Sequence, residues 1–293
     1  MATNSLSGVN ATRISQLTLD ALQTSVIPFS AFTTDFSPDI AERGSAVTTR
    51  FVTNPSVSNF AATRASQNST TTSKTVTLSN YVGVDLGFSD TEMSFSDVKL
   101  SEMFIKPAVV ALFENVIASV FALCTSANYS QNTLITAANF NAANIAGLAT
   151  NLNTAKVTSV GRQLIVSPSY MDTIRKDTSI TSTYAIGTSD VIQKGIFPTV
   201  HNFKLNEFNG TIPTNSESLT GIALAPQAVC VAARVPAMPR NWAGQVLNIT
   251  DPQSGLTLQW RDWYDGQEQR TQLCLIYGTQ VGVAGNLYRI RNA

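Results

Sequence analysis

Charged residues are scarce in this sequence. Asp, Glu, Lys and Arg make up 13% of its 293 residues, about half of the share that is usual in globular proteins. The 19 basic residues balance the 19 acidic ones, so no net charge draws the chain toward phosphate groups, membranes or acidic partners. A surface with so little charge associates readily. The composition therefore favours a protein that works in an assembly.

Histidine and cysteine are also rare, which restricts metal binding and catalysis. His201 is the single histidine, and a metal site with one His and no paired Cys would have to be built from carboxylates. No motif supplies the nucleophile and carboxylate that His201 would need as a catalytic base, so we expect it to be exposed. Cys124, Cys230 and Cys274 lie far apart in apolar runs without a CxxC spacing. We expect them to be buried free thiols in a reducing compartment.

One short segment carries three carboxylates and three aromatic side chains. They are Asp262, Asp265, Glu268, Trp260, Trp263 and Tyr264. Paired carboxylates beside aromatic rings could form the cleft of a hydrolase or a carbohydrate-binding protein. The alternative, which we favour, is a β-hairpin that turns at Asp265 and Gly266 and packs its rings on one face. Because the glycines follow no phosphate-loop or dinucleotide pattern either, we predict no catalytic, cofactor-binding or metal-binding residues and no enzyme activity.

Residues 96–126 form the longest apolar stretch of the chain. A polar or small stripe recurs along it at steps of three and four residues, which is typical of a helix. The stripe consists of Lys99, Glu102, Lys106, Glu114, Ala118, Ala122 and Thr125. We predict a helix, about 45 Å long if the whole stretch is helical, with a kink or restart at Pro107. It should be covered by the rest of the fold or by a neighbouring chain. A transmembrane span is the alternative, and Glu114 and Asn115 in its middle count against it.

The segment before this helix predicts an arm and a hairpin. Residues 11–24 should form a short amphipathic helix after a mobile arm, and the N-terminus lacks the apolar core of a signal peptide, so we expect a cytoplasmic protein. Residues 46–52 and 75–78 alternate as strands do, and the turn-rich residues 61–74 predict a flexible tip between them. Such a hairpin buries little apolar surface, so it must lie on its own domain or reach another subunit.

The remaining elements predict an α+β fold. Helices are expected at 136–140, 145–154, 169–176 and 189–194, a turn at 89–92 and a loop at 128–132. Strands are expected at 82–88, 162–168, 203–208, 221–225 and 228–234. Four further strands, at 245–249, 256–264, 271–277 and 280–284, should lie antiparallel beneath the long helix.

Segments that follow one another along the chain resemble the major capsid (coat) protein of tailed bacteriophages, whose fold is shared with herpesvirus capsid proteins. RGSAVTTRFV (43–52) is similar to the opening of that family's extended loop, and SDVKLSEMFIKPAVVAL (96–112) to the start of its spine helix. GRQLIVSPSYMDTIRKD (161–177) resembles the strand–proline–helix unit of its axial domain. ARVPAMP (233–239), followed by DPQSGLTLQWRDWYDGQEQ (251–269) and CLIYGTQVGV (274–283), resembles that family's return into the peripheral domain and its closing strands.

The resemblance covers residues 14–290 and implies four parts. These are an N-terminal arm (1–35), an extended β-hairpin loop (36–88), a peripheral domain with a spine helix (89–130 and 240–275) and an α/β axial domain (131–239 and 276–293). The implied function is structural: pentamers and hexamers self-assemble into an icosahedral shell around packaged double-stranded DNA, which they contact non-specifically. The implied location is the virion capsid, assembled in the bacterial cytoplasm, without a cofactor, a metal or a membrane.

The chain departs from some members of that family. It has no long N-terminal region that could act as a built-in scaffold, so we expect a separate scaffolding protein, with a portal as a further partner. Some relatives crosslink Lys to Asn between subunits; Lys74 is a conceivable donor, but nothing identifies an acceptor, and we do not predict the crosslink. Another phage assembly component, such as a decoration or tail-tube protein, is the alternative function.

Overall fold

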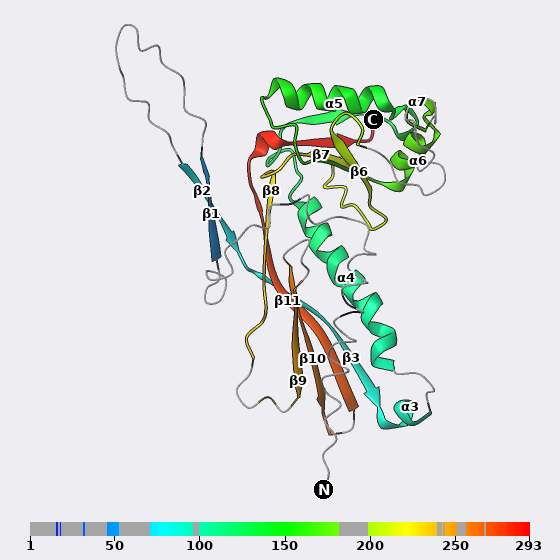
Figure 1. The fold of residues 1–293 in the computed structure, drawn as a ribbon, viewed down its shortest axis with the longest axis vertical. Coiled ribbons are helices and arrows are strands. Elements are labelled where there is room, and N and C mark those ends of the chain that lie inside the picture. The colour runs from blue at the N-terminus through cyan, green and yellow to red at the C-terminus, as the bar shows by residue number, and fades with distance from the viewer. Residues whose placement is uncertain are drawn as a thin grey trace.

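The computed structural model describes residues 16, 18, 32, 46–52, 71–95, 100–181, 199–238, 242, 244–250, 256–266 and 268–293. It contains helices and two separate five-stranded sheets, together with a two-stranded hairpin. One sheet lies along the long helix α4, the other lies at the C-terminal end of α4, and the hairpin projects to one side (Figure 1). The helices predicted at 11–24 and 189–194 lie outside the described residues, apart from Gln16 and Thr18, which are helical.

Helix α4 (Leu100–Ala122) has buried apolar flanks on both sides of the polar or small stripe that its sequence predicts. It runs without a break through Pro107, so the restart considered there does not occur. Pro107 is exposed, where water can bond the carbonyl group that loses its amide partner. The predicted stripe is exposed at Lys106, Glu114 and Ala122. The buried side chains of the helix are Ile105, Ala108, Val109, Leu112, Phe113, Val116, Ile117, Val120 and Phe121.

The apolar part of α4, Phe104–Ala122, is long and apolar enough to cross a membrane, with a mean hydropathy of 1.7. Half of this stretch is buried within the fold, where it joins the largest hydrophobic core of the described chain. A helix in the core of a folded domain has the same composition, and the packing of α4 indicates that role.

The sheet beneath α4 is antiparallel, as predicted. Its strands are β3 (Asn80–Ser89), β11 (Glu268–Val281), β10 (Thr257–Tyr264) and β9 (Gln245–Thr250) in spatial order, with β8 (Val229–Arg234) paired to the end of β11. Leu258, Trp260, Leu273 and Leu275 of this sheet share one core with α4. The residues predicted as strands at 82–88, 245–249 and 256–264 belong to it, apart from Leu256, which precedes β10.

Strand β11 corrects one prediction. Residues 271–277 and 280–284 were expected to form two strands, but β11 runs through both regions and ends at Val281. Gly278 between them makes no turn. A Cβ atom at Gly278 would lie 2.1 Å from the carbonyl oxygen of Thr77, so the glycine lets the hairpin approach β11 closely.

The second sheet is mixed and lies beyond the C-terminal end of α4 (Figure 1). Its strands, in spatial order, are β4 (Asn132–Leu134), β12 (Leu287–Arg291), β7 (Leu219–Leu224), β5 (Arg162–Val166) and β6 (Phe203–Glu207). Every residue of β5 is buried, as the predicted buried strand requires. Its side chains alternate between two cores: Ile165 faces the core of α4, and Leu164 and Val166 face a second core.

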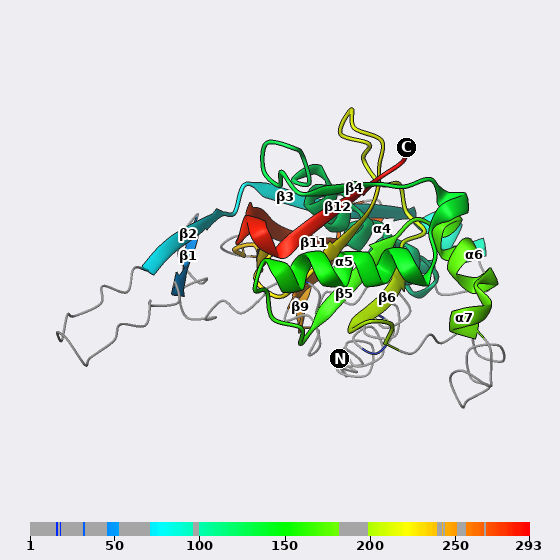
Figure 2. The same cartoon turned by 90° about the horizontal axis from the view of Figure 1, so that it is seen from above.

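Helices build that second core on the outer face of the sheet. They are α5 (Ala142–Thr154), α6 (Pro168–Lys176) and α7 (Thr178–Thr181), preceded by the short helix η2 (Ala137–Asn139). Figure 2 shows α5 lying across the sheet. Helix α5 begins three residues before the predicted start because Asn141 caps it, accepting a hydrogen bond from the amide of Asn144 at 3.2 Å.

Two local predictions were wrong near the ends of the hairpin region. Residues 89–92, expected as a turn, begin helix α3 (Asp90–Phe95). Ser89 and Glu92 form a capping box: Glu92 Oε2 accepts from the amide of Ser89 at 2.9 Å, and Ser89 Oγ accepts from the amide of Glu92 at 3.3 Å. Strand β2 (Thr71–Thr77) includes the last four residues that were assigned to the flexible tip.

The predicted hairpin is otherwise confirmed by the pairing of β1 (Ala46–Val52) with β2. The two strands are antiparallel, from Ala46 opposite Thr77 to Val52 opposite Thr71. The base of the hairpin packs on the body through a small core of Val47, Val76, Leu78, Cys230 and Ala232, and the partly buried Phe51 of β1 packs against it. Beyond this base the hairpin extends away from both sheets (Figures 1 and 2).

Candidate functional site

The residues considered for catalysis or metal binding are kept apart. His201 lies in an exposed turn, as predicted, with a backbone φ of 46°. Cys124, Cys230 and Cys274 are free and buried, also as predicted. Burial raises the pKa of Cys124 to about 12 and that of Cys230 to about 11, so reactive thiolate is scarce near neutral pH. Within the described ranges, no three His, Cys, Asp or Glu side chains are grouped as a metal site requires.

The three carboxylates near the β10–β11 turn do not converge on a cleft. Asp262 Oδ1 accepts hydrogen bonds from two side chains of β11, at 2.6 and 3.0 Å, and burial raises the pKa of this carboxyl group. Asp265 and Glu268 instead both lie beside Arg270, at 3.4 and 3.5 Å. Strands β10 and β11 pair directly across the turn, so the hairpin is confirmed. Its rings do not share one packed face, however: Trp260 lies in the α4 core, Trp263 contacts Trp242, and Tyr264 is exposed.

The β1–β2 hairpin offers a surface of a different kind. Its outward face carries exposed Thr48, Arg50, Ser73 and Thr75, with the hydroxyl groups of Thr48 and Thr75 hydrogen-bonded across the strands at 3.0 Å. Hydroxyl groups and main-chain edges favour contacts with another polypeptide over the binding of a small molecule. The hairpin is therefore a candidate binding surface for a second protein chain.

A cavity of about 500 Å³ separates the inward face of the hairpin from the body. One wall is formed by Phe51, Thr72 and Lys74 of the hairpin. The other is formed by the segment after α5, the β7–β8 turn and the connection from β11 to β12. Its lining residues are Ala155, Lys156, Val157, Thr158, Pro226, Gln227, Gly282, Val283 and Asn286.

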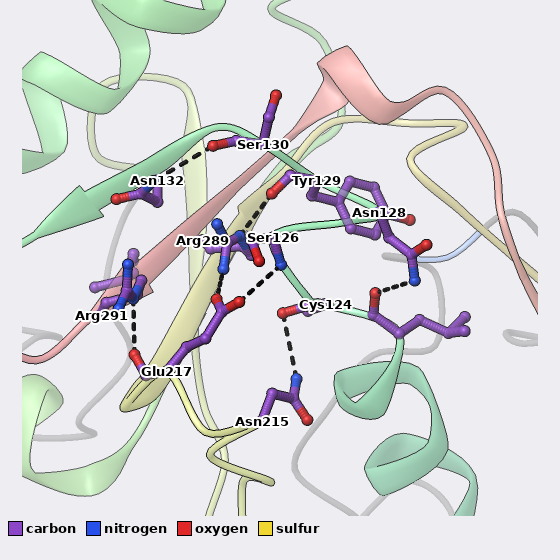
Figure 3. A network of polar contacts seen from close by, with 12 residues as sticks. Cys124, Ser126, Asn128, Tyr129, Ser130, Asn132, Asn215, Glu217, Arg289 and Arg291 are labelled. Carbon is purple, nitrogen blue, oxygen red and sulfur yellow. Dashed lines mark hydrogen bonds and ion pairs between the residues drawn. The ribbon is translucent and has the colours of Figure 1, made fainter.

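A polar network joins the second sheet to the C-terminal end of α4 (Figure 3). Its centre is an ion pair between Arg289 of β12 and Glu217 of the segment before β7, and the Arg289 side chain is only 1% exposed. Arg289 Nε also donates to the carbonyl oxygen of Tyr129 at 2.7 Å, and Glu217 Oε1 accepts from the amide of Ser126 at 3.0 Å. Burial lowers the pKa of Arg289. The network thus holds three distant segments in one place.

Asn215 also belongs to this network, which we call the junction, and lies at the C-terminal end of α4. Its side-chain amide donates to the carbonyl oxygens of Phe121 at 2.9 Å and Cys124 at 3.2 Å in the last turn of the helix and just after it, where carbonyl groups lose their regular helical partners. Asn215, Ser216 and Ser218 all have left-handed backbone conformations, which the Asn-Ser-Glu-Ser sequence tolerates better than bulky residues would. The position of α4 relative to the second sheet is therefore fixed by polar contacts as well as by the shared core.

Comparisons with known proteins identify this arrangement of elements. The chain is similar to a structure from Mycobacterium phage Che8, with a TM-score of 0.62 and 16% identity over 90% of each chain. It is also similar to the capsid structure of the cyanophage P-SCSP1u, with a TM-score of 0.61 and 11% identity over 92% of this chain and 88% of that one. The chain has the phage capsid fold.

The phage capsid fold also matches a shell from another source. A virus-like particle from Pyrococcus furiosus gives a TM-score of 0.51 and 8% identity over 96% of this chain and 99% of that one. No protein-family model and no curated protein matches the sequence, so the fold is conserved here where the sequence is not recognisable.

Within the phage capsid fold of this chain, the sequence located the hairpin but not the junction. Glu217 and Arg289 lie far apart in the sequence, and no short motif contains both. The one available signal is Arg289 itself, a charged residue at an alternate position of the buried strand β12, where an unpaired charge would be costly.

Proposed function

We propose that this chain is the major capsid protein of a tailed bacteriophage, a structural protein that self-assembles as pentamers and hexamers into an icosahedral shell around double-stranded DNA. The observation that carries the proposal is the match of about nine tenths of the chain to phage capsid structures. A hairpin that projects to one side of the body (Figure 1) supports it, because a shell subunit needs extended segments that reach neighbouring copies.

The four parts implied by the sequence form part of this proposal. Residues 89–130 and 240–275, with α4 as the spine helix, would form the peripheral domain, and 131–239 and 276–293 the axial domain. The hairpin would lie in the extended loop at 36–88, after the arm at 1–35. The two sheets and their separate helices support a division of this kind. Strand β11 itself crosses the proposed boundary between residues 275 and 276, and its axial part pairs with β8.

The partners and location follow from the same proposal. Copies of the chain would contact one another through heterologous surfaces, which close into rings. A scaffolding protein and a portal would guide assembly in the bacterial cytoplasm, and the product would be the virion capsid. The balanced charge of the chain supports non-specific DNA contact, since weak attraction lets DNA move during packaging.

Electron microscopy and size-exclusion chromatography of the purified protein, alone and with candidate scaffolding proteins from the same genome, test the proposal. Rings of five and six copies, or closed shells, are the expected result. Stacked rings that form tubes would instead support the decoration or tail-tube alternative. A stable monomer that never assembles with any scaffolding protein would contradict the proposal.

A shell other than a phage head is the second candidate, because the Pyrococcus furiosus virus-like particle matches almost the whole chain. Particles recovered from cells distinguish the two. Double-stranded DNA that survives nuclease treatment inside the particle is expected for a phage head. Particles that consistently enclose protein and no DNA would favour the second candidate.

A further inference from the structure

We propose that the cavity between the hairpin and the body receives the acidic end of the α4 sheet from a second copy of this chain. This inference rests on the proposed function, because it names the contact between neighbouring copies in a ring. Two oppositely charged surfaces at different ends of the same chain carry it: a cationic cavity and an acidic tip.

The cationic cavity carries two lysines and no carboxylate. Lys74 lies on the hairpin wall and Lys156 on the opposite wall, and the residues that line the cavity include no Asp or Glu. Neither lysine forms an ion pair with any residue in the part of the chain that the structure describes. At about 500 Å³ the cavity is large enough for several side chains. Two unpaired cations across such a space attract an anionic partner.

The body wall of the cavity is held in place before any partner binds. Arg162 donates to the carbonyl oxygens of Thr158 at 2.8 Å and Val157 at 2.7 Å, which fixes the segment that contains Lys156. Asn286 donates to the carbonyl oxygen of Pro226 at 2.7 Å on the same wall. A wall that is already ordered loses little entropy when it binds.

The acidic tip lies at the end of the α4 sheet farthest from the hairpin. Helix α3 and the β10–β11 turn meet there at the lower end of Figure 1, and the hydroxyl of Tyr264 donates to Asp90 at 2.9 Å between them. The described charged side chains of this region comprise six carboxylates and one cation. They are Asp85, Asp90, Glu92, Asp262, Asp265 and Glu268, with Arg270 as the cation.

The positions of the two surfaces determine the kind of assembly. The tip and the cavity lie at different ends of one chain (Figure 1), so the tip of one copy can enter only the cavity of the next. A contact between two different surfaces is heterologous, and it forms a ring when the rotation between copies closes. Charge complementarity thus favours the head-to-tail order and disfavours contacts of two tips or two cavities.

Two charge-reversed variants test the contact. One carries Lys74→Glu and Lys156→Glu in the cavity, and the other carries Asp265→Lys and Glu268→Lys in the tip. Each alone should raise the protein concentration needed for ring formation about tenfold or more, because like charges then face each other. The four substitutions in one chain should restore ring formation. The control, Lys106→Glu with Lys204→Glu, makes the same charge change at exposed positions outside the cavity and the hairpin and should assemble as the wild type does.

Mixing the two variants gives the sharpest result. Each cavity then matches only the tip of the other variant, so copies must alternate around the ring. Alternation allows six-membered rings and excludes five-membered ones, and we expect hexamers without closed shells by electron microscopy. Thermal unfolding of each variant shows that it is folded, and Lys74→Gln with Lys156→Gln provides a milder second test of the cavity.

Three outcomes would overturn the inference. They are wild-type assembly by the cavity variant, an equal loss in the control, and a four-fold variant that fails to assemble although it is folded. Failure of the wild type itself to form rings would instead count against the proposed function.

Discussion

Removing Glu217 should destabilise the subunit far more than removal of an exposed ion-pair partner. Arg289 would remain in the interior, with its side chain 1% exposed, without a counter-charge. Breaking a buried pair by removing one partner costs about 3–5 kcal/mol, whereas an exposed pair contributes about 0–1 kcal/mol. The amide of Ser126 would also lose its acceptor. We therefore expect Glu217→Ala to lower the free energy of unfolding by about 4 kcal/mol.

A double-mutant cycle measured by urea unfolding of the unassembled subunit checks this expectation. Its members are Glu217→Ala, Arg289→Met and the double variant. The double variant removes both charges, so it should be more stable than Glu217→Ala alone. Glu207→Ala is the matched control: its partner Arg175 is 48% exposed, and the loss should stay below about 1 kcal/mol.

Two results would refute the argument that the junction is desolvated. One is a loss for Glu217→Ala no larger than that for the Glu207→Ala control. The other is a double variant whose destabilisation equals the sum of the two single losses, because independent sites add in this way and coupled ones do not.

Four other changes have defined outcomes. Val116→Asp places a charge at a fully buried position and should leave the subunit unfolded by circular dichroism, since an unpaired buried charge costs several kcal/mol; a native spectrum would show that α4 is not a core helix. Gly278→Val should lower the melting temperature and separate the hairpin base from β11, because even a Cβ atom would lie 2.1 Å from the carbonyl oxygen of Thr77; an unchanged melting temperature would contradict that close approach. Burial raises the folded-state pKa of Asp262 above its unfolded value, so wild-type stability falls as pH rises from the unfolded pKa through the folded pKa. Asp262→Asn should lose this pH-dependent fall in stability, measured by urea unfolding at a series of pH values between 4 and 8. Identical pH profiles of the variant and the wild type would exclude a contribution from Asp262. Replacing residues 61–70 with two glycines should leave a folded subunit that assembles poorly, and loss of the folded state would show that the tip belongs to the core.

The elements that the sequence predicted well are those whose local pattern and packing agree. The apolar flanks of α4 repeat at helical spacing and are buried as expected, and the apolar run ending at Pro168 forms the fully buried strand β5. The hairpin was also recognisable, because residues 46–52 alternate as a strand does and the apolar Val47 of this strand is buried in the small core. In each case a few adjacent residues contain the whole signal.

The elements that were missed depend on partners distant in the sequence. Gly278 looks like a strand end until the close approach of Thr77 explains it. The Glu217–Arg289 pair becomes visible only when β12 is placed beside the segment before β7. The capping box of Ser89 and Glu92 is the exception, since Ser-Asp-Thr-Glu is a local signal for the helix that was assigned as a turn.

Strand β11 has a mechanical consequence for the whole subunit. It pairs with β3 and β10 along the α4 sheet and with β8 near its end, and the hairpin touches it at Gly278. A pull on the hairpin would enter the body at that residue and be shared, as shear, by backbone hydrogen bonds on both sides of one continuous strand. The hairpin is thus attached to a strand that is hydrogen-bonded on both sides and resists deformation. A strained contact between copies would extend the connecting loops before it disrupted the core.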